Sequence, residues 1–557
     1  AVSPKLAGKR NVKERRSGVV LRQWTCDWHG VACKSVARTG APVSIRATDS
    51  DNPMMGRMIT LATAAGRRDV VMRRAKLALV AALSLAVTSC ESMTDIFGDA
   101  AIKPSNSPVI AENVRTGKLA RVGAAQHPKI LATYGGEYSN PKLERMVAGI
   151  VGKLVTVSDN PGEVYQITIL NSPNVNAFAL PGGYLYITRG LLALANDTAE
   201  LAAVIAHEMG HVTANHGILR QQKEAEVELA SRVVSDVLAD KDAGRRALVR
   251  GKLRLAQFSR NQELQADAIG IQTIGEAGFD PYAAADFQKT MAAYMEFRNK
   301  SGNTDTSLDF LATHPSTPQR IELAVGHARK FGGRGQGERD RDAYLAGIDG
   351  MLFGDSPEEG YVRGQSYSHA ALGITFTFPQ GFSHNNRAFK LVGSRDKDNA
   401  AVRFDGADVP ASQPLATYIA SGWVEGLDPT SIRMTTVNGL QAATARASAD
   451  QWDFDITVIR AGGSVYRLLT AMPRGSVQLG QLAQEVRGSF RRLSSAEKRA
   501  LKPLTLQVVK AGPGQTEQSL ATRMRGVSRP RELFRVLNGL EGNQTVVTGQ
   551  SYKIVVD

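Results

Sequence analysis

The stretch "AHEMGHVTANHG" constrains this chain more than any other, because it places three histidines within ten residues. Asp197 and Glu200 precede it with the spacing of a capping box, which predicts that a helix begins near Asp197. On that helix His207 and His211 share one face, one turn apart, where two imidazoles can hold one tetrahedral cation. Glu208 lies beside such a cation and can take a proton from metal-bound water.

The third histidine, His216, is expected to lie away from the pair. Gly217 is expected to end the helix, and until then His216 is turned about 140° from His211. A metzincin requires glycine at 214 and histidine at 217. Because this chain has Ala214 and Gly217, that class is excluded, and His216 is predicted to be a structural or surface residue.

A second stretch, "NQELQAD", supplies the missing ligand. Glu263 and Asp267 are four residues apart and therefore share one face of a helix. Glu263 would complete a His, His, Glu site for zinc with the fourth position left for water, as catalytic zinc requires. Asp267 would accept the second N–H of a zinc-binding histidine and fix its tautomer.

The motifs "AHEMGHVTANH", "FSRNQELQADAIG" and "THPSTPQRI" resemble those of the HtpX-like zinc metallopeptidases, which are gluzincins. The resemblance covers roughly residues 110–355 and is greatest to the soluble periplasmic lipoprotein branch related to the β-barrel assembly-enhancing protease. It implies Glu208 as the catalytic carboxylate, Asp267 as the acid behind a ligand, and one Zn²⁺ per chain held by His207, His211 and Glu263. No tetratricopeptide repeat period, present in outer-membrane assembly relatives, occurs here.

Other residues of this region suit a peptidase. Residues 176–180, which include Asn176 and Phe178, are predicted to form an edge strand that aligns an extended substrate, or else an ordinary hairpin. His314 is a candidate for the open zinc position or the transition-state oxyanion. Arg320 is a candidate for contact with substrate, and both are alternatively features of a helix start.

An export signal is predicted inside the chain. Residues 72–89 read as a basic start, an apolar core and a small-residue cleavage site before Cys90, as in a bacterial lipoprotein. Lipidated Cys90 would anchor the protein in the periplasm, on the outer membrane of a Gram-negative bacterium, through a tether over 90–110. Since such a signal works at an N-terminus, residues 1–71 are predicted to be a wrongly assigned or disordered extension.

The net charge of +15 does not indicate nucleic-acid binding. Residues 1–71 hold 13 Lys and Arg against 5 Asp and Glu, and 72–76 add three more positive charges. The remaining chain therefore carries only +4, an ordinary protein surface. No cysteine follows Cys90, so the main body contains no disulfide.

The expected fold class is α+β with several domains. Residues 111–361 are predicted to form a mainly helical, zincin-like peptidase domain with a small β-hairpin or sheet. Alternating strands then predict an antiparallel α+β domain over 362–497, similar to PsbP-like and Mog1-like folds. Residues 498–557 read as strand, helix, helix, strand and are similar to a LysM-type module, which would bind cell-wall glycan.

The sequence therefore predicts a zinc metalloendopeptidase of the cell envelope. Its expected partners are misfolded or unassembled envelope proteins as substrates, the membrane through Cys90, and peptidoglycan, with no nucleic acid. The alternative is a glycan-binding or chaperone-like envelope lipoprotein with a non-catalytic zinc site. A zinc hydrolase acting on non-peptide amides also stays open, because the site chemistry does not name the substrate.

Overall fold

The structure is a computed structural model that describes residues 22–25, 34–37, 118–180, 182–237, 241–300, 310, 314–387 and 390–557. The chain divides into two compact units, residues 6–104 and the remainder. In the smaller unit, β1 (Arg22–Thr25) pairs antiparallel with β2 (Lys34–Ala37). The rest of the predicted extension, the signal over 72–89, Cys90 and the tether lie outside the described residues. No described helix is long and apolar enough to cross a membrane.

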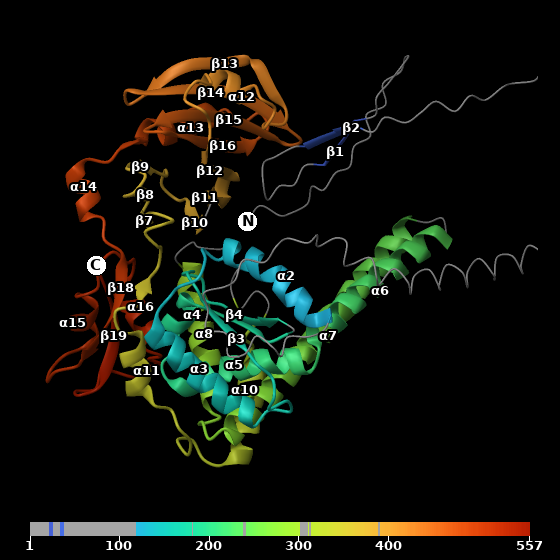
Figure 1. The fold of residues 1–557 in the computed structure, drawn as a ribbon, viewed down its shortest axis with the longest axis vertical. Coiled ribbons are helices and arrows are strands. Elements are labelled where there is room, and N and C mark those ends of the chain that lie inside the picture. The colour runs from blue at the N-terminus through green and yellow to red at the C-terminus, as the bar shows by residue number, and fades with distance from the viewer. Residues whose placement is uncertain are drawn as a thin grey trace, which may run out of the picture. The chain divides into compact units, whose positions relative to one another are not determined.

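The larger unit begins with two helices and a small sheet (Figure 1). In this sheet, of order β3-β5-β4, β3 runs parallel to β5 and β4 runs antiparallel to it. The elements are α2 (Lys118–Thr133), α3 (Pro141–Thr156), β3 (Gln166–Leu170), β4 (Ala177–Leu180) and β5 (Tyr184–Thr188). β4 is thus an edge strand.

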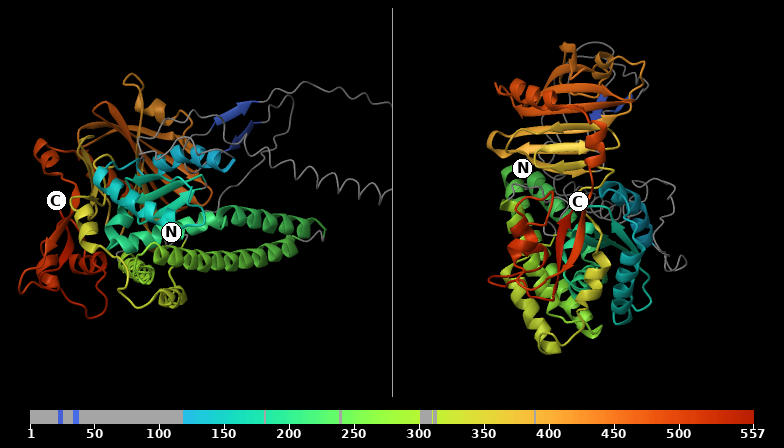
Figure 2. Two further views of the ribbon diagram at one scale, coloured as in Figure 1. Left: turned by 60° about the horizontal axis from the view of Figure 1, so that its bottom comes forward. Right: turned by 90° about the vertical axis from the view of Figure 1, so that its left-hand side faces the viewer.

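In the part of the chain that the structure describes, a series of helices follows the sheet. They are α4 (Arg189–Leu194), α5 (Thr198–Thr213), α6 (His216–Val237), α7 (Lys241–Glu276), α8 (Ala283–Lys300), α10 (Pro318–Ala328) with a 3₁₀ turn η3 (Arg329–Phe331), and α11 (Arg341–Ile348). Figure 2 shows α6 and α7 running side by side as a long hairpin. The mainly helical character expected of this region is confirmed.

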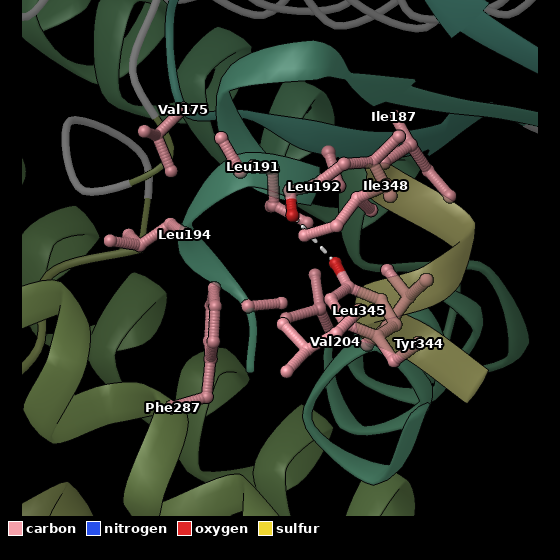
Figure 3. Packing of buried hydrophobic residues seen from close by; sticks show 14 of the residues in the cluster. Val175, Ile187, Leu191, Leu192, Leu194, Val204, Phe287, Tyr344, Leu345 and Ile348 are labelled. Carbon is pink, nitrogen blue, oxygen red and sulfur yellow. Dashed lines mark hydrogen bonds between the residues drawn. The ribbon is translucent and has the colours of Figure 1, made fainter. Parts of the chain in front are cut away.

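Helix α5 forms the centre of the core. Its residues from Thr198 to Gly210 are all buried, as in a helix covered on every side. Around α5, Figure 3 shows apolar side chains from the sheet, α4, α8 and α11, with the Tyr344 hydroxyl donating to the carbonyl of Leu192 at 2.7 Å. Because its surroundings are this well packed, α5 is held at a fixed position.

Residues 361–500 form two antiparallel sheets. The smaller has the order β17-β9-β8-β7 and the larger β10-β11-β12-β16-β15-β14-β13. The strands are β7 (Tyr361–Arg363), β8 (Ser366–His369), β9 (Ile374–Thr377), β10 (Ser383–Arg387), β11 (Lys390–Arg395), β12 (Ala400–Ala407), β13 (Leu427–Val437), β14 (Leu440–Ala449), β15 (Trp452–Ala461), β16 (Ser464–Pro473) and β17 (Arg491–Arg492). With them are α12 (Leu415–Ile419), α13 (Leu479–Ser489), α14 (Ser495–Ala500) and the 3₁₀ turn η4 (Asp396–Asp398).

The last segment has the predicted order of strand, helix, helix, strand: β18 (Leu504–Lys510), α15 (Glu517–Ala521), α16 (Pro530–Leu537) and β19 (Ser551–Val556). Its sheet also contains β6 (Leu352–Phe353), in the order β19-β18-β6. Apolar side chains of this segment belong to the same buried cluster as those of α4, α5 and α8. The protein is therefore α+β, but its C-terminal segment shares a core with the helical region.

The close crossing of α5 and α7 depends on a glycine. A Cβ added at Gly270 of α7 would lie 2.9 Å from the backbone nitrogen of His207. Real Cβ atoms are not found that near to a backbone atom, so any other residue would push the two helices apart. Gly210 of α5 is also close to α7, since its Cβ would lie 3.3 Å from the carbonyl oxygen of Ala266.

We therefore expect Gly270→Ala to lower the free energy of unfolding by about 1–3 kcal/mol through overpacking. Gly152→Ala is the matched control, because Gly152 is an exposed residue of α3 with open space around it. There alanine should raise the free energy by about 0.5–1 kcal/mol. Urea denaturation measures both, and equal stability of the two variants would contradict the close crossing.

Candidate metal centre

Two histidines of α5 converge on one point. The helix begins where the sequence predicts, with the carboxylate of Asp197 accepting from the backbone N–H of Glu200 at 2.8 Å. One turn apart near its other end, His207 and His211 bring their Nε2 atoms to 3.1 Å from each other. Both rings therefore offer the same nitrogen to the same small volume.

Helix α7 brings a carboxylate to this volume. Glu263 Oε2 lies 3.5 Å from His207 Nε2, and Glu263 Oε1 lies 3.4 Å from His211 Nε2. On the opposite side of the first ring, Asp267 Oδ1 lies 3.0 Å from His207 Nδ1. The Glu-x-x-x-Asp spacing thus places one acid among the candidate ligands and the other behind a ligand.

His314 provides a further nitrogen. Its Nδ1 lies 3.0 Å from Glu263 Oε2 and 3.2 Å from His207 Nε2. The ring stacks on Phe310, with 4.4 Å between the ring centres, and the backbone N–H of His314 donates to the Phe310 carbonyl at 2.7 Å. The four residues could each offer one ligand atom, and these atoms lie within 4.8 Å of one another.

The donor set fits zinc. Two imidazole nitrogens and a carboxylate are the ligands of catalytic His₂Glu zinc sites, and four-coordinate geometry suits the small volume they enclose. Burial favours the neutral form of Glu263, yet its contacts with His207, His211 and His314 outweigh burial and hold the pKa of its carboxyl well below the usual range. Glu263 is thus ionised, as a metal ligand must be.

Glu208 is buried next to the cluster. The side chain is 3% exposed, and no donor among the described residues bonds to its Oε1. Nε2 of His314 lies 3.7 Å from that oxygen. Since an unsatisfied buried acceptor costs about 1–3 kcal/mol, this oxygen is poised to accept a proton or hydrogen bond from a molecule that enters the site.

Arg320 lies behind the candidate ligands and is itself 6% exposed. Its Nε and Nη2 donate to the two oxygens of Asp267, both at 2.7 Å, and its Nη1 lies 3.0 Å from Glu263 Oε2. The sequence suggested a contact with substrate, but this guanidinium is used within the protein. It compensates two buried carboxylates, and it helps to hold the pKa of Asp267 below its usual value against the opposing effect of burial.

His216 lies closer to the cluster than the sequence predicts. α5 ends at Thr213, four residues before Gly217, and Asn215 adopts a left-handed backbone with φ 54°. This break places His216 at the start of α6, buried, with its Nδ1 2.9 Å from Nδ1 of His211. Asparagine tolerates left-handed φ, so Asn215 was the sequence signal for the break.

The hydrogen bonds of His216 orient His211. Its Nε2 lies 3.1 Å from Gln265 Oε1, an acceptor, so this contact fits the tautomer with the proton on Nε2, in which Nδ1 can accept. His211 then donates from Nδ1 and keeps the lone pair of Nε2 for the cation. His216 thus lies behind a candidate ligand and can position it, as Asp267 lies 3.0 Å behind the ring of His207.

The predicted edge strand lies beside α5. Asn176 is buried just before β4, and its amide donates to the Tyr134 hydroxyl at 3.0 Å. Phe178 stacks on Tyr186 at 4.9 Å. Because the N–H of Thr188 donates to the carbonyl of Asn176, alternation along the pair turns the backbone groups of residues 177 and 179 away from β5. Residue 177 is fully buried, whereas residue 179 is partly exposed.

Comparisons with known proteins bear on this region. Residues 139–327 match the family described as Peptidase family M48. The mitochondrial metalloendopeptidase OMA1 of Schizosaccharomyces pombe is 30% identical over 211 residues, 36% of this chain and 58% of that one. OMA1 of Arabidopsis thaliana is 36% identical over 165 residues, which are 29% of this chain and 31% of that one. The β-barrel assembly-enhancing protease of Escherichia coli K12 is 27% identical over 203 residues, which are 35% of this chain and 40% of that one.

This chain thus spans less than two thirds of each of these relatives. Among solved structures, cyanobacterial PsbP from Synechocystis is similar at 14% identity with a TM-score of 0.21, over 25% of this chain and 98% of that one. A TM-score this low does not establish a shared fold, so the PsbP-like fold of residues 362–497 stays a prediction.

We expect His216→Leu to weaken zinc binding about 10–100-fold, because the substitution removes the acceptor that fixes the tautomer of His211. Competition with a chromophoric chelator measures the affinity. His327→Leu is the control, since His327 lies on α10 and its ring contacts an exposed lysine. Equal zinc affinity of the two variants would contradict the role of His216.

Proposed function

The domain that carries this site belongs to peptidase family M48, and we propose that it is a zinc-dependent endopeptidase of the bacterial cell envelope. The observation that carries the proposal is the buried Oε1 of Glu208, to which no donor of the described residues is hydrogen-bonded, beside a His, His, Glu donor set. Four protein donors lie within reach of one ion, so the donor set alone does not separate a catalytic from a structural site; the free base next to it does, because a structural zinc site needs none. The geometry therefore favours catalysis over a non-catalytic zinc site.

The residues that would hold the metal are His207, His211 and Glu263, with His314 within reach as a further donor. Zinc bound there supplies Lewis-acid chemistry, lowering the pKa of water and polarising a peptide carbonyl. Around it, Asp267 and His216 fix the orientations of the two α5 rings, and Arg320 balances the charge of the carboxylates.

Glu208 is the proton carrier of the proposed reaction. Its Oε1 accepts a proton from the attacking water and returns it to the amine that leaves when the peptide bond breaks. The carboxylate comes directly after His207 on a buried helix, so its distance from the metal ligands is fixed by the backbone.

The substrate is proposed to be an extended polypeptide. β4 has a partner on one side only among the described strands, and the outward backbone groups of Ala179, which is partly exposed, can pair with a further strand. Pairing through the backbone accepts many side chains, which suits unfolded or misassembled proteins. Asn176 and Phe178 take part by holding β4 in place through Tyr134 and Tyr186.

The cellular setting rests on the sequence. The lipoprotein-type signal over 72–89 supports periplasmic location with an anchor at Cys90, on the outer membrane of a Gram-negative bacterium. There the protein would remove misfolded or unassembled envelope proteins. Binding of peptidoglycan by residues 498–557 is a separate proposal, tested by retention on isolated cell-wall glycan.

The function is tested by Glu208→Gln, which keeps the size of the side chain and removes the base. We expect one zinc per chain to be retained and casein cleavage to fall about 10²–10⁴-fold, the usual contribution of a general base. Glu276→Gln, an exposed glutamate at the end of α7, should leave cleavage unchanged. Casein turnover by Glu208→Gln at the wild-type rate, with zinc bound, would refute the proposal.

A further inference from the structure

A lysine of the C-terminal strand is buried in the helical region. The side chain of Lys553, on β19, is 0% exposed. Its Nζ donates to the carbonyls of Ala193, Leu194 and Ala195 at 2.9, 3.3 and 2.7 Å. An ammonium has three N–H donors, so all are used. These residues are about 360 positions away in the sequence and belong to the end of α4.

The carbonyls that Lys553 binds are those that the end of a helix leaves unsatisfied. The α4–α5 connection is buried, so these groups have no access to water and need a donor from elsewhere in the protein. No carboxylate of the described residues forms an ion pair with Lys553, and its three hydrogen bonds all go to backbone carbonyls. Its hydrogen bonds therefore serve the backbone of the connection.

Lys553 is itself held rigidly. The side chain of Asn538, at the end of α16, accepts from the backbone N–H of Lys553 at 2.7 Å and donates to its carbonyl at 2.9 Å. Arg341 adds a second link between the same parts, donating to the carbonyls of Asn196 at 2.9 Å and Ser551 at 3.3 Å. The C-terminal segment is thus hydrogen-bonded to the residues directly before α5 at two points, through Lys553 and through Arg341.

The start of α5 follows at once. Asp197 is its N-cap, and Glu200 in its first turn accepts from the backbone N–H of Asn196 at 2.8 Å. From there the helix continues without a break to His207, Glu208 and His211. A shift of the connection would therefore move the metal ligands as well, because the helix transmits it as a rigid rod.

We propose that residues 504–556 are an integral part of the peptidase, in which Lys553 is a positioning residue for the helix that carries the metal ligands. This inference rests on the proposed function. It goes beyond the resemblance of the segment to a glycan-binding module, because it assigns the segment a task inside the chain. The M48 match ends at residue 327, well before this segment.

The test compares Lys553→Met with Lys510→Met in the full-length protein. Methionine matches the length of lysine and has no donor, and Lys510 is an exposed residue of the neighbouring strand β18. For Lys553→Met we expect a Tm lower by about 5–10 °C, since three carbonyls lose their donor. Well below that Tm, zinc affinity should fall about 10-fold and kcat on casein should fall with KM unchanged, because β4 is not disturbed. Lys510→Met should behave as wild type.

A folded Lys553→Met protein with wild-type zinc affinity and kcat would overturn the inference. If that variant does not fold, a protein with a protease site inserted at 501–503 provides the second test of the inference. After cleavage there, the C-terminal fragment should co-elute with the rest of the chain and the zinc. Separation of the fragment from a body that keeps its zinc would overturn the inference. Zinc affinity and co-elution need no turnover, so they remain informative if the wild type binds zinc and cleaves nothing.

Discussion

The close crossing of α5 and α7 is the contact on which the site depends. His207 and His211 come from one helix and Glu263 and Asp267 from the other, and the two meet only because Gly270 lets the backbones approach. The cost of bringing two imidazoles and two carboxylates into a buried space is offset by Arg320, which binds both acids. At this crossing, close packing of the two helices and compensation of the buried charges therefore occur at the same place.

Each ring of the pair on α5 is oriented from behind by a different group. Asp267 faces Nδ1 of His207, and His216 faces Nδ1 of His211, so both rings offer Nε2 to the centre. The charge on Asp267 is matched by Arg320, whereas His216 is anchored by the amide of Gln265. Such outer contacts fix ring orientation before a metal binds, which lowers the cost of binding it.

The other end of α5 is fixed by charged groups that come from far along the chain. Arg339 donates to Asp197 at 2.8 Å, and Lys553 holds the turn before it. Burial raises the pKa of Glu200 to about 7, with the nearby charge of Asp197 adding to the effect. A helix that is apolar over most of its length thus has polar contacts at both ends, and these determine its position.

The sequence by itself determined which residues of α5 and α7 are the candidate ligands. Spacing of four residues in His207–His211 and in Glu263–Asp267 fixes a shared helical face, because helical periodicity is a local property. It also determined the start of α5 at Asp197 and the order of strand, helix, helix and strand along the C-terminal segment. Only the tertiary structure decided which groups His216, Arg320 and Lys553 contact. Their partners lie on other elements or beyond a helix break, and no local pattern encodes which distant backbone a side chain will meet.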